Sequence, residues 1–157
     1  STQGVSSAAS DVYKRQQLID EGYQVVLFGS AKDHEAGNEI LAALNTEQQA
    51  WCRNLAGETQ LDQAVILIAA CKAIVTNDSG LMHVAAALNR PLVALYGPSS
   101  PDFTPPLSHK ARVIRLITGY HKVRKGDAAE GYHQSLIDIT PQRALEELNA
   151  LLLQEEA

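Results

Sequence analysis

The 157-residue sequence lacks several features that would place a protein in a special class. It has only two cysteines, Cys52 and Cys71, which form no CxxC pair and no evident disulfide framework. It has no excess of basic residues, and its net charge of -5 argues against general nucleic-acid binding, because proteins that bind nucleic-acid phosphates are usually basic. Its longest apolar run, Ala64 to Cys71, is much too short to cross a bilayer. We therefore expect a cytosolic protein whose two thiols are reduced and buried as small apolar residues.

The best-known glycine-rich nucleotide motifs are missing as well. The chain contains no GxGxxG, so the dinucleotide fingerprint is absent, and no GxxxxGK followed by serine or threonine, so there is no P-loop. What remains is ordinary in composition: 45% of the residues are apolar and 20% are charged. The length is sufficient for one domain with a sizeable core.

The sequence alternates short β-branched runs with amphipathic stretches. Local signals mark several helix ends: Gly22 suits a helix C-terminus, Thr59 and Asp62 fit a capping box, and Thr140 precedes a proline at a helix start. Strands are expected at 23–29, 73–77, 91–97 and 111–118, a weaker strand near 52–56, and helices at 33–44, 46–51, 59–71, 80–89 and 140–153. This alternation predicts parallel βαβ units, hence an α/β fold with a Rossmann-like, doubly wound parallel sheet.

The beginning of the chain differs from the rest. Residues 1–16 are small and polar, have no periodicity, and resemble a translated adapter, so we expect them to be a non-native tail outside the fold. The domain is then expected to cover 17–157 and to start inside a helix. A chain that starts inside a helix is expected to be the C-terminal part of a longer protein.

The stretch TNDSGLMHVAAAL, residues 76–88, places polar side chains where a strand passes into a helix. Ligands in parallel α/β sheets bind beyond the carboxyl ends of the strands, and the N–H groups of a helix start favour an anion there. Ser79 could cap the helix or donate to a phosphate, Gly80 permits close approach, and His83 lies one turn on. Asp78 would repel a bare phosphate, and it suits hydrogen bonds from sugar hydroxyls or from neighbouring backbone N–H groups better. A simple N-cap with a structural histidine explains the same residues, and the residues alone leave both interpretations open.

Other loops at the same predicted edge are weaker candidates. Glu35, in a first helical turn, could accept hydrogen bonds from a ribose diol, although acids are common at that position. The backbone around Thr59 could border an adenine. The proline-rich loop 97–106 could line an entrance or only turn a corner. The basic loop 119–133 is ordinarily a solvated segment, and its functional alternative is contact with an anionic glycan at a membrane surface.

Three stretches, residues 25–40, 55–101 and 136–152, closely resemble the ADP-heptose:lipopolysaccharide heptosyltransferases of glycosyltransferase family 9, and in particular its heptosyltransferase II branch. The Asp-Ser-Gly-x-x-His core at 78–83 and the following RPLVALYGP at 90–98 are the most specific parts. The resemblance implies the C-terminal, donor-binding half of a two-domain GT-B enzyme. Such an enzyme transfers L-glycero-D-manno-heptose from ADP-heptose to the lipopolysaccharide inner core, inverting the anomeric centre without a metal or cofactor.

The resemblance also implies roles for individual residues. Asp78 would contact heptose hydroxyls, and the diphosphate would be bound at the helix start by a group of neighbours: Ser79, Gly80 and Leu81, with His83 close by. Glu35 would hold the ribose, and Thr59 would lie along the adenine.

The family's general base and a phosphate-binding lysine fall in the N-terminal domain, so we name no catalytic residue and expect this chain alone to bind donor weakly and not to turn over. Many relatives also carry cysteines in the segment corresponding to 119–138, where this chain has none, which puts a shared role for that segment in doubt.

Two other function classes stay open. Another GT-B glycosyltransferase or a sugar-nucleotide epimerase would use the same diphosphate site, and a free-standing nucleotide-binding module would use it without catalysis. The expected partners are the ADP-heptose donor, the lipopolysaccharide acceptor and the absent N-terminal domain, with no nucleic acid. The expected location is the cytoplasm, with peripheral association at the inner face of the inner membrane left open.

Overall fold

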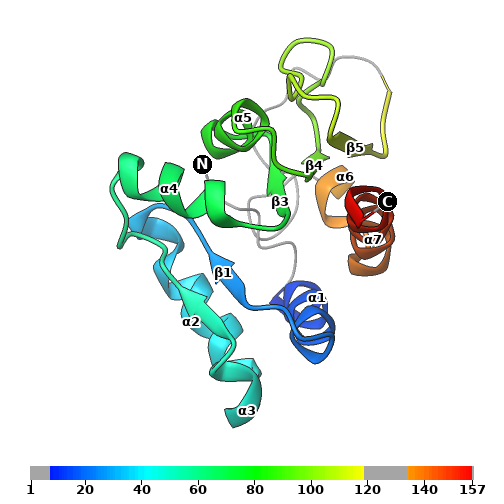
Figure 1. The fold of residues 1–157 in the computed structure, drawn as a ribbon. Coiled ribbons are helices and arrows are strands. Elements are labelled where there is room, and N and C mark those ends of the chain that lie inside the picture. The colour runs from blue at the N-terminus through cyan, green and yellow to red at the C-terminus, as the bar shows by residue number, and fades with distance from the viewer. Residues whose placement is uncertain (1–7, 119–133, 157) are drawn as a thin grey trace. The chain divides into compact units, whose positions relative to one another are not determined.

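The structure is a computed structural model that describes residues 8–118 and 134–156 (Figure 1). The chain divides into two compact units, Ser1–Ala64 and Val65–Ala157, and the division falls inside α4. The elements follow in chain order: α1 (Ala8–Asp20), β1 (Val25–Leu27), the 3-10 turn η1 (Ala31–Asp33), α2 (His34–Ala43), α3 (Thr46–Gln49), β2 (Cys52–Asn54), α4 (Leu61–Ala70), β3 (Ile74–Asn77), α5 (Gly80–Ala87), β4 (Leu92–Tyr96), β5 (Ala111–Arg115), α6 (Gln134–Ile137) and α7 (Pro141–Glu156).

The first unit is built around a two-stranded parallel sheet. β1 and β2 pair in register, with Val25 opposite Cys52 and Leu27 opposite Asn54. α1 and α2 contact these strands and each other. The apolar core between them consists of Ile19, Leu27, Ile40, Leu44 and Cys52. β1 is shorter than the predicted strand 23–29, because its partner β2 has only three residues to pair with it.

α1 ends as the sequence indicates, but it begins earlier than expected. Gly22 adopts a left-handed φ of +92°, and its N–H donates to the carbonyl of Ile19 at 2.9 Å. The N–H of Tyr23 donates to the carbonyl of Leu18 at 3.0 Å, which completes a Schellman motif. The helix starts at Ala8, so part of the segment set aside as a tail is helical. The origin of residues 1–16 stays a prediction, and residues 1–7 lie outside the described part.

The second unit contains a three-stranded parallel sheet in the order β3-β4-β5. Ile74 pairs with Leu92, and Leu92 pairs in turn with Ala111. Every residue of the central strand β4 is buried, which accounts for its unbroken apolar sequence, because a central strand covered on both faces needs no polar alternation.

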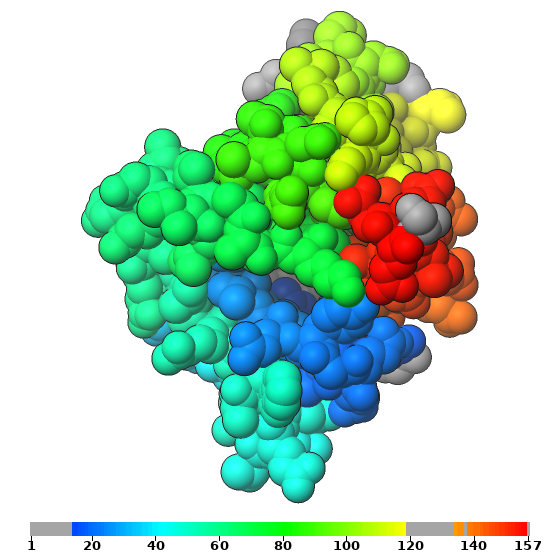
Figure 2. All heavy atoms as spheres, in the orientation of Figure 1, coloured from blue at the N-terminus to red at the C-terminus, as the bar shows by residue number. Residues whose placement is uncertain are grey.

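Helices cover both faces of this sheet. The hydroxyl of Tyr96 lies 3.3 Å from the Sδ of Met82 on α5, whereas a Cβ added at the next residue, Gly97, would lie 3.1 Å from the Cβ of Leu136 on α6. Because successive residues of an extended chain point to opposite faces, α5 and α6 flank opposite faces of β4. α7 also packs on β4 and forms a continuous red-to-orange strip of the surface in Figure 2. The predicted α/β class with parallel strands and helices on both faces is confirmed.

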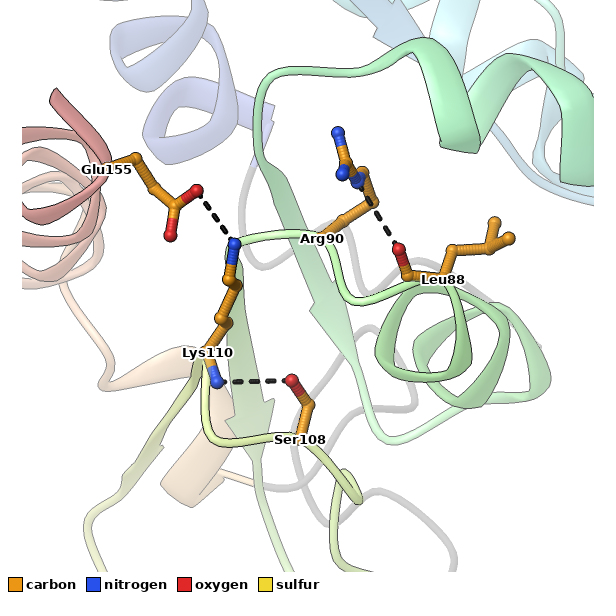
Figure 3. A network of polar contacts seen from close by, with 5 residues as sticks. All are labelled: Leu88, Arg90, Ser108, Lys110 and Glu155. Carbon is orange, nitrogen blue, oxygen red and sulfur yellow. Dashed lines mark hydrogen bonds and ion pairs between the residues drawn. The ribbon is translucent and has the colours of Figure 1, made fainter.

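The amino ends of β4 and β5 carry a network of polar contacts that is structural in character (Figure 3). Lys110, directly before β5, donates through Nζ to Glu155 of α7 at 2.9 Å, and its backbone N–H donates to the Ser108 hydroxyl at 3.1 Å. Arg90, before β4, donates through Nε to the carbonyl of Leu88 at 3.4 Å. These contacts fix α7 and the ends of the loops at the edge of the sheet opposite to the predicted site.

One predicted cap is wrong. α4 begins at Leu61, and the side chain of Gln63 accepts a hydrogen bond from the backbone N–H of Gln60 at 2.9 Å. The hydrogen bond from the N-cap backbone N–H to the side chain three residues later is therefore formed one residue later than the Thr59–Asp62 pattern predicts, with glutamine in place of aspartate. The Thr140 cap is confirmed, because its Oγ1 accepts the N–H of Arg143 at 3.1 Å.

Both cysteines are free, but only one is fully buried. Burial raises the pKa of the Cys52 thiol, and the nearby Arg15 offsets part of that shift. Cys71 is partly exposed, which corrects the expectation that both are core residues, and its Sγ lies 3.2 Å from the carbonyl of Leu67. None of the helices in the described ranges combines the length and the apolarity that crossing a membrane requires.

Candidate functional site

The junction between β3 and α5 is held by the side chain that starts the helix. Ser79 is the N-cap of α5, with extended φ and ψ of -152° and 169°, and its Oγ accepts the N–H of Met82 at 3.4 Å. The same Oγ lies 3.3 Å from the hydroxyl of Thr76, which itself donates to the carbonyl of Asn77 at 3.0 Å. A hydroxyl has only one proton to donate. Because Thr76 donates its proton to the Asn77 carbonyl, it acts as the acceptor toward the Ser79 hydroxyl. Of the two roles open to Ser79, the structure shows the cap.

The first turn of α5 leaves N–H groups open to a ligand. Within the described residues, no acceptor is recorded for the backbone N–H of Gly80 or Leu81, as is normal for the first positions of a helix. Gly80 is exposed, and a Cβ added there would meet no atom within 4 Å. Two free donors, a helix dipole and open space over Gly80 are together suited to an anion.

Asp78 precedes this turn and is held from the loop that follows β4. The Oγ1 of Thr104 donates to Oδ2 of Asp78 at 3.0 Å. Thr104 is fixed in turn by Tyr96, whose hydroxyl donates to the Thr104 carbonyl. Burial, followed by the nearby Asp78 carboxylate, raises the pKa of Tyr96 well above its usual range, and the side chain of Thr104 offsets part of that shift. Tyr96 is therefore a neutral donor to the Thr104 carbonyl.

The start of the same loop is fixed by the neighbouring strand. Arg115, the last residue of β5, lies with Nε 3.3 Å from the carbonyl of Gly97 and Nη2 3.4 Å from that of Pro98. Further along, the N–H of Thr104 donates to the carbonyl of Ser100 at 3.2 Å, and Ser100 is buried. The carboxyl ends of all three strands thus contribute to one structured edge.

Thr104, Tyr96 and Arg115 were not predicted as parts of the site. The proline-rich loop 97–106 was expected either to line an entrance or only to turn a corner, and nothing in its pattern distinguishes Thr104 from Ser99 or Ser100. Only the pairing of β3 with β4 shows which loop hydroxyl reaches Asp78.

The predicted site residues fall into two groups. Asp78, Ser79, Gly80 and Leu81 are consecutive at the junction, and His83 is exposed on the next part of α5. The other two predicted residues, Glu35 and Thr59, belong to the first unit, so a common site with Asp78 stays a prediction.

The segment around Glu35 is closely fixed. Glu35 is exposed in the first turn of α2. One residue earlier, Nδ1 of His34 lies 2.9 Å from the carbonyl of Ala56, and the N–H of Gly57 donates to the carbonyl of Gly29 at 2.9 Å. The loops after β1 and β2 are therefore joined to each other, and Thr59 follows two residues after Gly57.

Across 8–118 and 134–156, no group of three or more His, Cys, Asp or Glu side chains is placed to hold a metal ion. The basic loop 119–133 lies outside the described residues.

Comparison with known proteins gives a family match over most of the chain. The model of glycosyltransferase family 9 (heptosyltransferase) matches residues 14–133. The chain is 99% identical over 142 residues to lipopolysaccharide heptosyltransferase 2 of Escherichia coli strain K12, covering 90% of the chain and 41% of that protein. It is 91% identical over 140 residues to lipopolysaccharide heptosyltransferase 2 of Salmonella typhimurium strain LT2, covering 89% of the chain and 40% of that protein.

Among solved structures, the chain matches that of E. coli ADP-heptose lps heptosyltransferase II with a TM-score of 0.86 and 86% sequence identity. The match covers 96% of this chain and 43% of the solved one. The chain therefore spans about two fifths of the length of the curated relatives it matches.

Proposed function

The chain belongs to glycosyltransferase family 9, the heptosyltransferases, and from this we propose that it is the donor-binding part of an enzyme that transfers heptose from ADP-heptose to the lipopolysaccharide inner core. The names of its relatives include lipopolysaccharide and ADP-heptose. The observation that carries the proposal most directly is the pair of free N–H groups on Gly80 and Leu81 beside the Asp78 carboxylate. One part of this edge suits a diphosphate, and the other suits sugar hydroxyls.

The proposed division of labour follows the chemistry of each group. The N–H groups of Gly80 and Leu81 bind the diphosphate, with Ser79 holding the helix end in place. Asp78 accepts hydrogen bonds from heptose hydroxyls through the lone pairs that Thr104 leaves free. Glu35 and Thr59 hold the ribose and the adenine.

Bond cleavage is assisted at the leaving group. When the bond between the anomeric carbon and the diphosphate oxygen breaks, negative charge develops on ADP, and the N–H groups at the start of α5 stabilise that charge. An acceptor hydroxyl attacks the opposite face of the anomeric carbon, which inverts its configuration, and its proton passes to a base outside this chain. The chain alone therefore binds donor without turning it over, and the remaining domain and the acceptor complete the reaction.

The location proposed with this activity is the cytoplasm, with peripheral contact to the inner face of the inner membrane where lipopolysaccharide is assembled. Two rival functions use the same edge of the sheet. Another sugar-nucleotide enzyme would bind a different nucleotide, and a non-catalytic module would bind ADP as tightly as ADP-heptose.

Isothermal titration of the chain with ADP-heptose, ADP and a UDP-sugar separates these functions. We expect binding of ADP-heptose and ADP, tighter for ADP-heptose, and none of the UDP-sugar. Asp78→Asn should weaken ADP-heptose about tenfold, the effect expected from losing a charge-assisted hydrogen bond. The matched control is Asp62→Asn, at an exposed carboxylate in the first turn of α4. Equal affinity for ADP and ADP-heptose in the unmodified chain would support the module, and preference for the UDP-sugar would support a different enzyme.

A further inference from the structure

We propose that Thr104 is a positioning residue that orients the Asp78 carboxylate toward the sugar of the donor. The inference rests on the proposed function, because it assigns Asp78 to the heptose. It adds to that function a residue from a different loop, outside the Asp-Ser-Gly junction.

Thr104 holds one side of the Asp78 carboxylate. Thr104 Oγ1 donates to Oδ2 of Asp78 at 3.0 Å across 26 residues of sequence. The next acceptor, the Ser100 carbonyl, is 3.3 Å from the same hydroxyl, so the single proton favours Asp78, which is both nearer and charged. A carboxylate offers about four lone-pair positions, and Thr104 occupies one of them. The other positions remain available to a ligand, and the bond to Thr104 restricts how the carboxylate can turn.

Thr104 is itself held in place by the core. Its carbonyl accepts the hydroxyl of Tyr96, a fully buried residue at the end of β4 with 0% of its surface exposed. Its N–H donates to the carbonyl of Ser100, which is buried as well. A chain of contacts thus leads from the core of the second unit to the Asp78 side chain.

The loops that carry Asp78 and Thr104 leave β3 and β4 at the same edge of the sheet. The strands are parallel neighbours, with Asn77 at the end of β3 opposite Leu95. Asp78 follows the first strand directly, and Thr104 lies in the loop after the second. Since both loops leave the carboxyl edge, the bond between them sets the orientation of the acid on the side where ligands of parallel sheets bind.

The simplest alternative is that Thr104 only stabilises the loop. In that case its removal would affect the loop and the affinity for every ligand alike. If Thr104 instead positions the Asp78 carboxylate for the heptose, its removal weakens the binding of ADP-heptose and spares that of ADP, which has no heptose. The ratio of the two affinities is therefore the readout that separates the roles.

The experiment titrates ADP-heptose and ADP into the full chain and into Thr104→Val, Thr104→Ser and Tyr96→Phe. Thr104 is exposed, so valine, which has the same shape, is compatible with the fold. We expect Thr104→Val to lose about tenfold in ADP-heptose affinity while its ADP affinity stays within about twofold. Serine keeps the hydroxyl and should restore most of the loss. Tyr96→Phe, which removes only the hydroxyl that holds the Thr104 backbone, should weaken ADP-heptose about threefold.

Two results would overturn the inference while leaving the proposed function intact. One is unchanged ADP-heptose affinity in Thr104→Val and Tyr96→Phe. The other is an equal loss of ADP and ADP-heptose affinity in Thr104→Val that serine does not restore. Failure of the unmodified chain to prefer ADP-heptose over ADP is a different result, and it would overturn the proposed function together with this inference.

Discussion

The hydroxyl oxygen of Ser79 accepts the backbone N–H of Met82 at 3.4 Å, so the side chain that begins α5 is engaged with its own helix. Its other neighbour is the hydroxyl of Thr76, 3.3 Å away. In the proposed anion site, Ser79 therefore acts mainly by fixing the helix end, and the backbone N–H groups of Gly80 and Leu81 are the proposed donors to the ligand. The predictions for Ser79 and Gly80 follow from this division.

Substitutions of Ser79 should separate its effect on stability, through the helix cap, from the effect of local charge on ADP affinity. Ser79→Ala removes the cap and should lower the free energy of unfolding by about 1 kcal/mol, measured by urea denaturation. Ser79→Asp keeps a good cap but adds a negative charge at the proposed diphosphate site, so stability should be retained while ADP affinity falls strongly. Ser79→Asn is the matched control, with a similar size and cap but no charge. Equal ADP affinities for the Asp and Asn variants would show that no anion binds at this helix end.

Gly80→Ala should leave the fold intact and weaken nucleotide binding. A Cβ at this position meets no atom within 4 Å, and alanine is a better helix former than glycine. Thermal unfolding should therefore occur at the same or a higher temperature. The added methyl group lies in the space proposed for the diphosphate, and titration should show weaker binding of both ADP and ADP-heptose. Undiminished ADP affinity would place the diphosphate elsewhere.

Gly37→Ala should destabilise the first unit through Asn54. An added Cβ would lie 2.4 Å from the side-chain oxygen of Asn54, whose amide donates to the carbonyl of His34 at 2.9 Å and to Asn38 at 3.0 Å. Because that amide is fixed by these bonds, the overpacking should cost about 1–3 kcal/mol in urea denaturation.

The cause is testable with a double-mutant cycle. Asn54→Ala removes the clashing group, so the cost of Gly37→Ala measured in that background should be clearly smaller. Strictly additive costs for the two substitutions would show that the clash does not occur.

Tyr96 should make stability depend on pH in the alkaline range. Its pKa in the folded chain is raised above the ordinary value of 10.0, so the folded state holds the phenol proton more tightly than the unfolded state. The resulting stabilisation is fully present below pH 10 and is lost as pH rises toward the raised pKa, with a slope of up to about 1.4 kcal/mol per pH unit. Urea denaturation between pH 9 and 11 should show a shallower decline for Tyr96→Phe. Identical slopes would show that the phenol does not titrate differently in the two states.

Features of the fold that depend on neighbouring residues were predictable from the sequence. Gly22, the expected C-terminal glycine of the first helix, ends α1 through a left-handed turn with a φ of +92°. The apolar run at 91–97 was expected to form a strand, and β4 covers Leu92–Tyr96. These predictions succeeded because capping and burial act within a few residues. The Thr59 cap failed because two overlapping patterns were present, and Gln60 with Gln63 formed the bond.

Features of the site that depend on distant residues were not predictable. The Asp-Ser-Gly junction was visible because its residues are consecutive. Thr104 was not, because its contact with Asp78 depends on the pairing of β3 with β4 and on the path of a loop rich in proline. Arg115 was equally hidden, since its bonds to Gly97 and Pro98 join the ends of two strands.

An NMR titration of the 15N-labelled chain with ADP and then ADP-heptose tests most directly whether the first turn of α5 binds the donor. The amide resonances of Gly80 and Leu81 should shift with both ligands, whereas those of Asp78 and Thr104 should shift further when the heptose is present. If the Gly80 and Leu81 resonances stayed in place while saturating ADP-heptose moved amides elsewhere, the diphosphate would not bind at this helix.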